Sequence, residues 1–227
     1  MIQAVIFDID NTLYDFDTAN THGMAAVYNY CRQMFGLDQE TALSYYRKAW
    51  HLVEQHVGSD TAAIHNRLLR FQCMMELLKQ PLFPHAQMLY RVYWDHVLAH
   101  MQPSPGIQAF MKNLKEAGMT IGIGTDMTAY IQYRKLELLG LYPYIDMVVT
   151  SEEAGAEKPS PKFFRLCVEK IGCPPECCAF IGDNIKKDVE GAIAYGLQGM
   201  WYSQGKEPKE HVPFPVICSF EKYLLQN

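Results

Sequence analysis

Four short runs of mainly apolar residues constrain the fold of this chain more than any other feature of its sequence. The runs are MIQAVIFD at 1–8, MTIGIGTD at 119–126, IDMVVTS at 145–151 and CCAFIGD at 177–183. A strand with one face in water alternates apolar and polar residues, whereas a parallel strand covered on both faces is apolar at most positions. The runs therefore predict parallel strands buried between two layers of helices.

Helical periodicity fills the segments next to these runs, at 107–118, 127–140, 161–172 and 189–196. Three of these helices end in a glycine suited to a left-handed helix cap, namely Gly118, Gly140 and Gly172. The alternation of strand and helix predicts an α/β fold with a doubly wound parallel sheet, a Rossmann-like core. Two more strands are expected, at 198–202 and within 213–220, followed by a C-terminal helix.

Residues 17–102 follow a different pattern, because they contain no convincing strand. Long polar–apolar periodicities are interrupted at Gly36, at Gly58 and near Pro81, which predicts four helices in a separate bundle. The chain returns to the α/β pattern through QPSPG at 102–106, a composition suited to a hinge. We therefore expect two domains, an α/β core formed by 1–16 and 103–227 and a helical domain formed by 17–102.

Composition narrows the classes of partner and compartment. The chain has 227 residues and a net charge of −5, so no broad basic surface is available for a nucleic acid polymer or an anionic membrane. No secretory signal and no run approaching the roughly 18 apolar residues of a membrane span is found, so a cytoplasmic protein is expected.

The seven cysteines lack CxxC spacing, which favours reduced thiols over disulfides. Two zinc sites stay open as alternatives. One is the group Cys173, Cys177 and Cys178, and the other uses His96 and His100 at helical ligand spacing.

Acidic and hydroxyl side chains follow the ends of the predicted strands. They are Asp8, Asp10, Thr125, Asp126, Asp183 and, further on, Asp188, with Lys158 in a loop before the next helix. The carboxyl ends of parallel strands meet at one edge of the sheet, where ligands bind. Clustered carboxylates repel one another, so a cation should hold them, and Mg²⁺ prefers oxygen ligands. A carboxylate, a hydroxyl, a lysine and a magnesium ion together are suited to phosphoryl transfer.

In these motifs the chain resembles the haloacid dehalogenase superfamily of phosphatases. The family's elements stand here in order as DIDNT at 8–12, TD at 125–126, KP at 158–159 and GDNIKKD at 182–188. The resemblance covers the α/β segments, and the helical insertion matches by position the helical cap of the first type. It implies an enzyme, a phosphoric monoester hydrolase, that forms an aspartyl-phosphate with Mg²⁺ as its cofactor.

The resemblance also implies roles for single residues. Asp8 would be the nucleophile, kept ionised by Mg²⁺, and Asp10 the general acid and base that keeps a proton. Asp8, the carbonyl of Asp10, Asp183 and Asp188 would hold the metal. Thr125, Asp126 and Lys158 would bind the phosphoryl group. Position 126 is often Asn in the family, and Asp126 adds charge near a phosphate unless its backbone N–H faces the substrate.

Several functions stay open at this point. The expected substrate is a small phosphate ester, a nucleoside monophosphate or a sugar phosphate, and the stretch from Gly182 to Trp201 resembles the branch with nucleoside monophosphate and acylneuraminate phosphatases. A 2-haloacid dehalogenase of the same fold is an alternative, although such relatives usually lack the second aspartate that is Asp10 here. A phosphomutase and a non-catalytic phospholigand-binding protein are further alternatives. An aromatic stripe in the insertion, Tyr28, Phe35, Tyr45, Tyr46 and Trp50, is expected in its core, with lining of the substrate pocket by some of its members left as an alternative.

Overall fold

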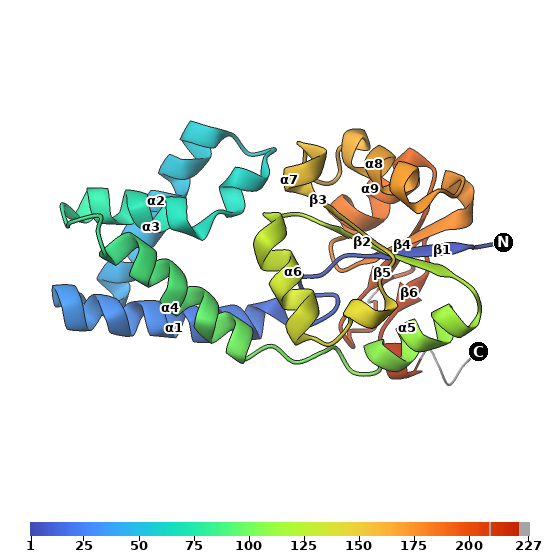
Figure 1. The fold of residues 1–227 in the computed structure, drawn as a ribbon, viewed down its shortest axis with the longest axis horizontal. Helices are drawn as coiled ribbons and strands as arrows, with labels where there is room; N and C mark the ends of the chain where they lie inside the picture. Colours follow the sequence, from blue (N-terminus) through green and yellow to red (C-terminus); the bar gives the residue numbers. More distant parts are fainter. Residues whose placement is uncertain (209, 223–227) are drawn as a thin grey trace. The chain divides into compact units, whose positions relative to one another are not determined.

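The computed structural model describes residues 1–208 and 210–222, which form two compact units. One unit contains Met1–Asp15 and the described residues from Gln102 onward, and the other contains Phe16–Met101. The first is the α/β unit and the second the helical unit (Figure 1).

The α/β unit is built on a parallel sheet whose described strands run in the order β3-β2-β1-β4-β5-β6. The strands are β1 (Ala4–Phe7), β2 (Thr120–Thr125), β3 (Met147–Thr150), β4 (Cys178–Gly182), β5 (Gln198–Tyr202) and β6 (Val216–Ile217). β1 is central, because Ala4 pairs with Thr120 of β2 on one side and with Cys178 of β4 on the other. The predicted doubly wound parallel sheet is confirmed. Most of the expected C-terminal helix lies outside the described residues.

Helices cover both faces of this sheet, as the apolar strands require (Figure 1). On one face, Phe164 of α8 (Pro161–Ile171) and Ala192 of α9 (Gly191–Tyr195) join a buried cluster with Ile6 and Phe180. On the other face, Phe110 of α5 (Ile107–Glu116) packs edge-on against Phe7, with 6.1 Å between ring centroids. β1 and β4, which are buried at every position, are therefore shielded from water on both sides, and this removes the alternation that a half-exposed strand would show.

Shorter elements complete the α/β unit. They are α6 (Ala129–Leu138), α7 (Ser151–Ala154), the 3₁₀ helices η2 (Tyr142–Tyr144) and η3 (Pro175–Cys177), and the π-helical turn η4 (Ile185–Glu190). The three predicted glycine caps are confirmed, with φ of +77° at Gly118, +67° at Gly140 and +72° at Gly172. The helix predicted at 189–196 is in fact η4 followed by α9, so it begins earlier and changes pitch at residue 191.

The helical unit contains α1 (Phe16–Phe35), α2 (Gln39–Val57), the short 3₁₀ helix η1 (Ala62–His65), α3 (Arg67–Leu78) and α4 (His85–Ala99). α1 packs against α4 and α2 packs against α3. Gly23 permits the first contact, because a Cβ there would lie 2.9 Å from the carbonyl oxygen of Tyr93. Among the described residues, no helix has both the length and the apolar character that a membrane span needs.

The aromatic stripe of the helical unit differs from expectation. Tyr46 is buried, but Trp50 is 43% exposed, so the prediction that this stripe is core is wrong for Trp50. Tyr28, Tyr46 and Trp50 line a cavity inside the helical unit. Tyr46 and Trp50 lie one turn apart on α2, as the periodicity indicated, but periodicity carries no information on whether the opposing side chains fill the space above them.

Candidate functional site

Three aspartates from separate elements of the α/β unit meet at the carboxyl edge of the sheet. A carboxylate oxygen from each of Asp8, Asp183 and Asp188 lies within 4.8 Å of the others. Asp8 directly follows β1, and its backbone N–H donates to the carbonyl of Ile181 in β4 over 2.9 Å. The carbonyl of Asp183, after β4, accepts a 3.0 Å hydrogen bond from the indole N–H of Trp201 in β5. Neighbouring strands thus fix the backbone that carries the carboxylates.

Asp188 reaches this edge because the chain turns sharply after β4. Its Oδ2 accepts a 3.0 Å hydrogen bond from the backbone N–H of Asn184, which closes the turn that begins η4. The side chain lies directly against Gly182, where a Cβ would come within 2.4 Å of the Asp188 Cγ. A glycine at 182 is therefore required for Asp188 to approach the strand end.

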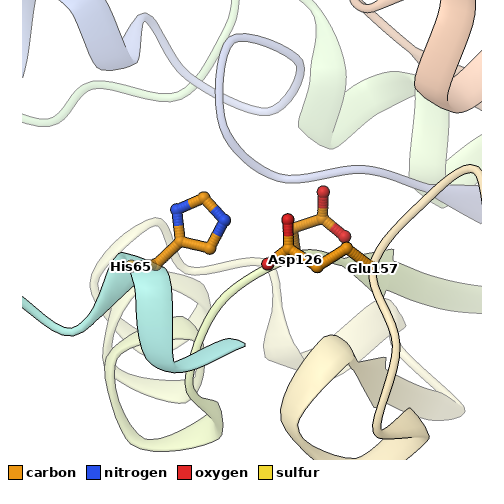
Figure 2. Close-up of side chains that lie close together, drawn as sticks. All are labelled: His65, Asp126 and Glu157. Carbon is orange, nitrogen blue, oxygen red and sulfur yellow. The ribbon is translucent and has the colours of Figure 1, made fainter. Parts of the chain in front are cut away.

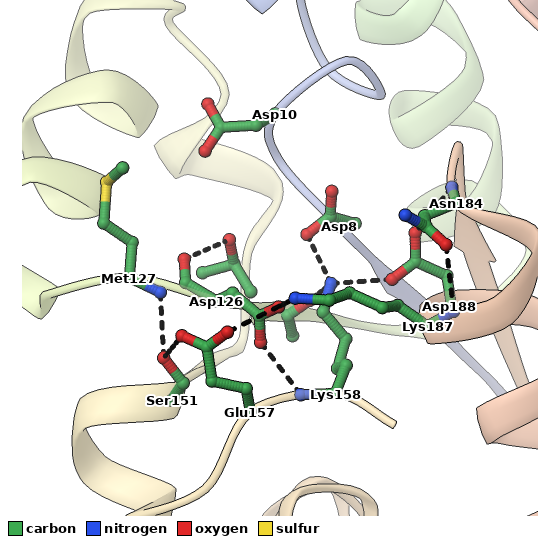
Figure 3. A network of polar contacts seen from close by, with 12 residues as sticks. Asp8, Asp10, Asp126, Met127, Ser151, Glu157, Lys158, Asn184, Lys187 and Asp188 are labelled. Atoms are coloured by element: carbon green, nitrogen blue, oxygen red, sulfur yellow. Dashed lines mark hydrogen bonds and ion pairs between the residues drawn. The ribbon is translucent and has the colours of Figure 1, made fainter. Parts of the chain in front are cut away.

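Lys158 bridges two of the three carboxylates (Figure 3). Its Nζ lies 2.6 Å from Asp8 Oδ1 and 2.8 Å from Asp188 Oδ1, and its side chain is 3% exposed. The rings of Phe163 and Phe180 lie 5.8 and 5.4 Å from the Nζ and keep water away from it. Burial lowers the pKa of Lys158, but the charges of Asp188 and Asp8 outweigh it and hold the pKa well above its usual value. Lys158 is therefore a permanent cation.

One lysine does not balance three carboxylates. Burial raises the pKa of Asp8 well above its usual value, Lys158 lowers it, and Asp188 and Asp183 raise it further. Burial and the charge of Asp188 raise the pKa of Asp183 to about 7. Lys158 alone does not offset this crowding of carboxylates, so the expectation that Mg²⁺ keeps Asp8 ionised stays a prediction. An all-oxygen donor set with excess negative charge suits a hard divalent cation, and such a cation would restore the ionised Asp8.

The raised pKa of Asp183 gives a prediction for stability against pH. The folded state binds this proton up to about pH 7, whereas the carboxyl has a pKa of 3.8 when unperturbed. The proton on Asp183 therefore stabilises the folded state. This stabilisation is fully present below pH 3.8 and is lost as the pH rises to about 7. We expect the melting temperature without divalent cations to fall from about pH 4 to about pH 7. Differential scanning calorimetry across that range measures it.

Added Mg²⁺ should counteract this loss, because the metal binds deprotonated carboxylates. The rise in melting temperature on adding Mg²⁺ is expected to be larger above pH 7 than near pH 5. Asp183→Asn is the matched control and should lose most of both effects. Equal stabilisation by Mg²⁺ in Asp183→Asn and in the parent chain would contradict the prediction.

Asp10 lies apart from this cluster and has its own cation. Lys135 of α6 is fully buried, and its Nζ lies 2.6 Å from Asp10 Oδ1 and 2.9 Å from Oδ2. The Tyr14 hydroxyl donates to Oδ1 over 2.5 Å, and the Gln132 amide donates to Oδ2 over 3.3 Å. Sequence reasoning identified neither Lys135 nor Gln132. Their three-residue spacing on the helix that follows β2 is the available signal, since it indicates that both side chains lie on one face of that helix.

These contacts correct the expected protonation state of Asp10. Burial raises the pKa of Asp10, but the charge of Lys135 and the hydrogen bonds from Lys135, Tyr14 and Gln132 together bring it below its usual value. Asp10 is therefore ionised in this arrangement, not protonated as predicted. Its carboxylate is bound to Lys135, and the expected role of its carbonyl as a metal ligand stays a prediction.

Replacing Lys135 by methionine tests this pair. Lys135→Met removes the cation that holds the pKa of Asp10 down, so that pKa should rise. The limb of the pH profile of kcat that reports Asp10 is expected to shift to higher pH, by about one unit or more. Lys115→Met is a control, because Lys115 pairs with Asp146 on the protein surface. An unshifted limb in Lys135→Met would exclude the pair from setting the protonation of Asp10.

The remaining predicted site residues come from β2 and the turn after it. Thr125 is 1% exposed, and its Oγ1 accepts a 2.7 Å hydrogen bond from the amide of Gln132. Asp126 lies beside Glu157 (Figure 2), and the Nζ of Lys187 binds both carboxylates, at 2.9 and 3.2 Å. The other oxygen of Asp126 accepts the backbone N–H of Lys158 over 3.0 Å. The extra charge of Asp126 is thus compensated by Lys187, which sequence reasoning missed.

Neither of the two alternative zinc sites is found among the groups of possible metal ligands that the described residues form. The Nδ1 atoms of His96 and His100 lie 2.9 and 2.8 Å from carbonyls of their own helix, at Val92 and His96. Within the described part of the chain, neither histidine belongs to a group of metal-type ligands. All seven cysteines are free thiols, as expected.

Comparison with known proteins adds independent information. A family model described as haloacid dehalogenase-like hydrolase matches residues 2–196. A ribulose-1,5-bisphosphate 5-phosphatase of Halopiger xanaduensis is 35% identical over 209 residues, which cover 91% of this chain and 87% of that protein. A glyceraldehyde 3-phosphate phosphatase of Methanopyrus kandleri is 32% identical, covering 91% of this chain and 86% of that protein.

Among solved structures, a 2-haloacid dehalogenase of Pseudomonas syringae has a TM-score of 0.79 at 21% identity, covering 99% of this chain and 97% of that chain. At this identity the likeness shows the fold alone. The family match, by contrast, spans both the α/β unit and the helical insertion, and it includes every motif at the sheet edge. The chain belongs to the haloacid dehalogenase-like hydrolases.

Proposed function

We propose that the protein is a Mg²⁺-dependent phosphatase that hydrolyses a small phosphorylated metabolite, with sugar phosphates favoured over nucleoside monophosphates. The observation that carries the proposal is Lys158 held between Asp8 and Asp188, with Asp183 alongside. The strand-end carboxylate can act as a nucleophile, and the buried lysine beside it is a cation that can bind phosphoryl oxygens. The two relatives named above, both phosphatases of sugar phosphates, support the substrate class.

Asp8 is the proposed nucleophile. One of its carboxylate oxygens attacks phosphorus, so an O–P bond to Asp8 forms while the bond from phosphorus to the ester oxygen breaks. Lys158, 2.6 Å from Asp8, lies where it can bind the oxygens of the transferring group, which spreads its negative charge in the transition state. Thr125 and the backbone next to Asp126 are the proposed further donors. Water then attacks the aspartyl-phosphate and releases inorganic phosphate.

Asp10 is the proposed source of the proton for the leaving oxygen. The structure has it ionised, so it must gain a proton when substrate binds. A phosphate dianion near Asp10 raises the pKa of this carboxyl, because two like charges disfavour each other. Lys135 and Tyr14 keep the carboxyl oriented throughout, since both bind Oδ1 at 2.6 Å or less. In the second step Asp10 takes the proton of the attacking water.

Asp8, Asp183 and Asp188, with the carbonyl of Asp10, are the residues that would hold Mg²⁺. When bound, the metal would supply positive charge that keeps Asp8 ionised and orients the phosphoryl group. The helical unit is proposed to act as the cap that selects the substrate and excludes water.

The function is tested by measuring phosphate release from a panel of sugar phosphates and nucleoside monophosphates, with Mg²⁺ and with EDTA. Phosphate release that requires Mg²⁺ is the expected result. Halide release from 2-haloacids is measured in parallel, and phosphate that reappears on another carbon of the sugar identifies a mutase. Release of halide without release of phosphate would overturn the proposal in favour of the dehalogenase alternative.

A further inference from the structure

The helical unit contains a cavity of about 670 Å³ whose wall is rich in arginine. α1, α2 and α3 contribute its lining, which includes Asn20, Tyr28, Tyr46, Arg47, Arg67 and Arg70. Amide and phenol groups stand among three guanidinium groups, and none of the described residues that line the cavity is an aspartate or a glutamate. A cavity with this lining is electropositive and offers hydrogen-bond donors.

Arg70 is the buried member of the set, with 3% exposure. Its Nε and Nη2 donate to the carbonyl of Ile64, over 3.1 and 2.5 Å, and its Nη1 lies 3.5 Å from the Tyr46 hydroxyl. A guanidinium has five N–H donors, so two remain after these three bonds. The ring of Trp50 covers the group, with its centroid 4.6 Å from Cζ. The side chain is held rigidly while part of its donor capacity is left over.

The charge of Arg70 also lacks a compensating carboxylate within the described residues. Arg67, itself buried, adds a second positive charge instead of a negative one. Burial and the charge of Arg67 lower the pKa of Arg70 to about 10, so it remains protonated at neutral pH. A buried cation without a carboxylate is costly, and an anion that accepts its remaining N–H groups would relieve that cost.

We propose that this cavity binds an acidic small molecule, whose phosphate or carboxylate group accepts hydrogen bonds from Arg70 and is attracted by Arg67 and Arg47. Arg47 is exposed and supplies charge at the cavity wall without a structural role in the core. Tyr28 and Asn20 give the ligand hydroxyl groups partners. The same chemistry would suit a second acidic group on the substrate or a separate acidic metabolite, and the test below distinguishes them.

The test uses inorganic phosphate as the probe and side-chain NMR of the full chain without Mg²⁺. Trp50 covers Arg70 in the cavity, whereas the indole of Trp201 bonds Asp183 at the sheet edge, so their indole N–H signals report two separate places. Saturable shifts of the Trp50 and Arg70 Nε–H signals are expected. Arg47→Gln should weaken this binding about fivefold, the effect of one charge at partial exposure. Arg91→Gln, on the exposed surface of α4, should leave it unchanged.

Signals of Trp50 and Arg70 that do not move with phosphate, or that move equally in Arg47→Gln, would overturn the proposal. Arg47→Gln is chosen over changes of Arg70 because the latter would also remove the bonds to Ile64. The binding test needs no turnover, so a failure of the proposed phosphatase function does not affect it.

The source of the ligand, which rests on the proposed function, is decided by kinetics on a pentose bisphosphate and the matching monophosphate. A larger rise in KM for the bisphosphate in Arg47→Gln identifies the second phosphate of the substrate as the ligand. Equal KM changes, with weakened binding of inorganic phosphate, identify a separate acidic ligand.

Discussion

Asp8→Asn is expected to abolish phosphate release, with kcat falling by at least about 10⁴-fold, a loss typical of removing a nucleophile. An amide oxygen is a far weaker nucleophile than a carboxylate. Among the described residues, Asp188 is the other carboxylate bound to Lys158, but it lies in η4 and not at the end of β1. Initial rates of phosphate release with a saturating sugar phosphate measure the effect.

Folding should survive this change. Asp8→Asn removes one of three crowded carboxylates, and Lys158 keeps Asp188 as a partner at 2.8 Å. The melting temperature without metal is therefore expected to stay equal or rise, while the stabilisation by Mg²⁺ shrinks. Asp95→Asn, on the exposed surface of α4, is the control and should change neither rate nor melting temperature. Full activity in Asp8→Asn would refute its assignment as the nucleophile.

Asp10→Asn is expected to reduce turnover of a sugar phosphate by roughly 10²–10⁴-fold, the usual contribution of general acid–base catalysis. The asparagine cannot deliver a proton to the leaving alkoxide. p-Nitrophenyl phosphate has a leaving group that needs little protonation, so the loss in the first step should be smaller with it. The measurement is the ratio of the variant's rate to the parent's rate, determined for each of the two substrates and then compared.

Stabilisation by Mg²⁺ should be retained in Asp10→Asn, because the carboxylate of Asp10 binds Lys135 and not the acidic cluster. Tyr14→Phe is a useful companion variant, since it removes one hydrogen bond to Asp10 and leaves the carboxyl in place. Its loss of rate should be smaller than that of Asp10→Asn. An unchanged rate in Asp10→Asn would remove its acid–base role.

The sequence alone determined the type of sheet and the placement of acidic residues along it. Parallel strands covered on both faces leave a local signature, a run of apolar residues, and the runs before Asp8 and Asp183 became β1 and β4. Left-handed helix ends also leave a local signature, a glycine after the last helical residue, and Gly118 and Gly140 adopt the expected positive φ. Once the strands are parallel, their carboxyl ends share an edge, so the meeting of Asp8 and Asp183 follows from topology.

Only the tertiary structure decided which charges pair with which. Lys135 is 125 residues away from Asp10, and Lys187 is 61 residues away from Asp126. Nothing in either local sequence indicates these partners, because an ion pair across a fold depends on where a helix is placed and not on periodicity. The ionisation of Asp10 was predicted wrongly for this reason: its adjacent residues Ile9 and Asn11 supply no cation, and the lysine that lowers its pKa comes from α6. The sequence shows which charged residues are present, but their pKa values depend on which of them the fold brings into contact.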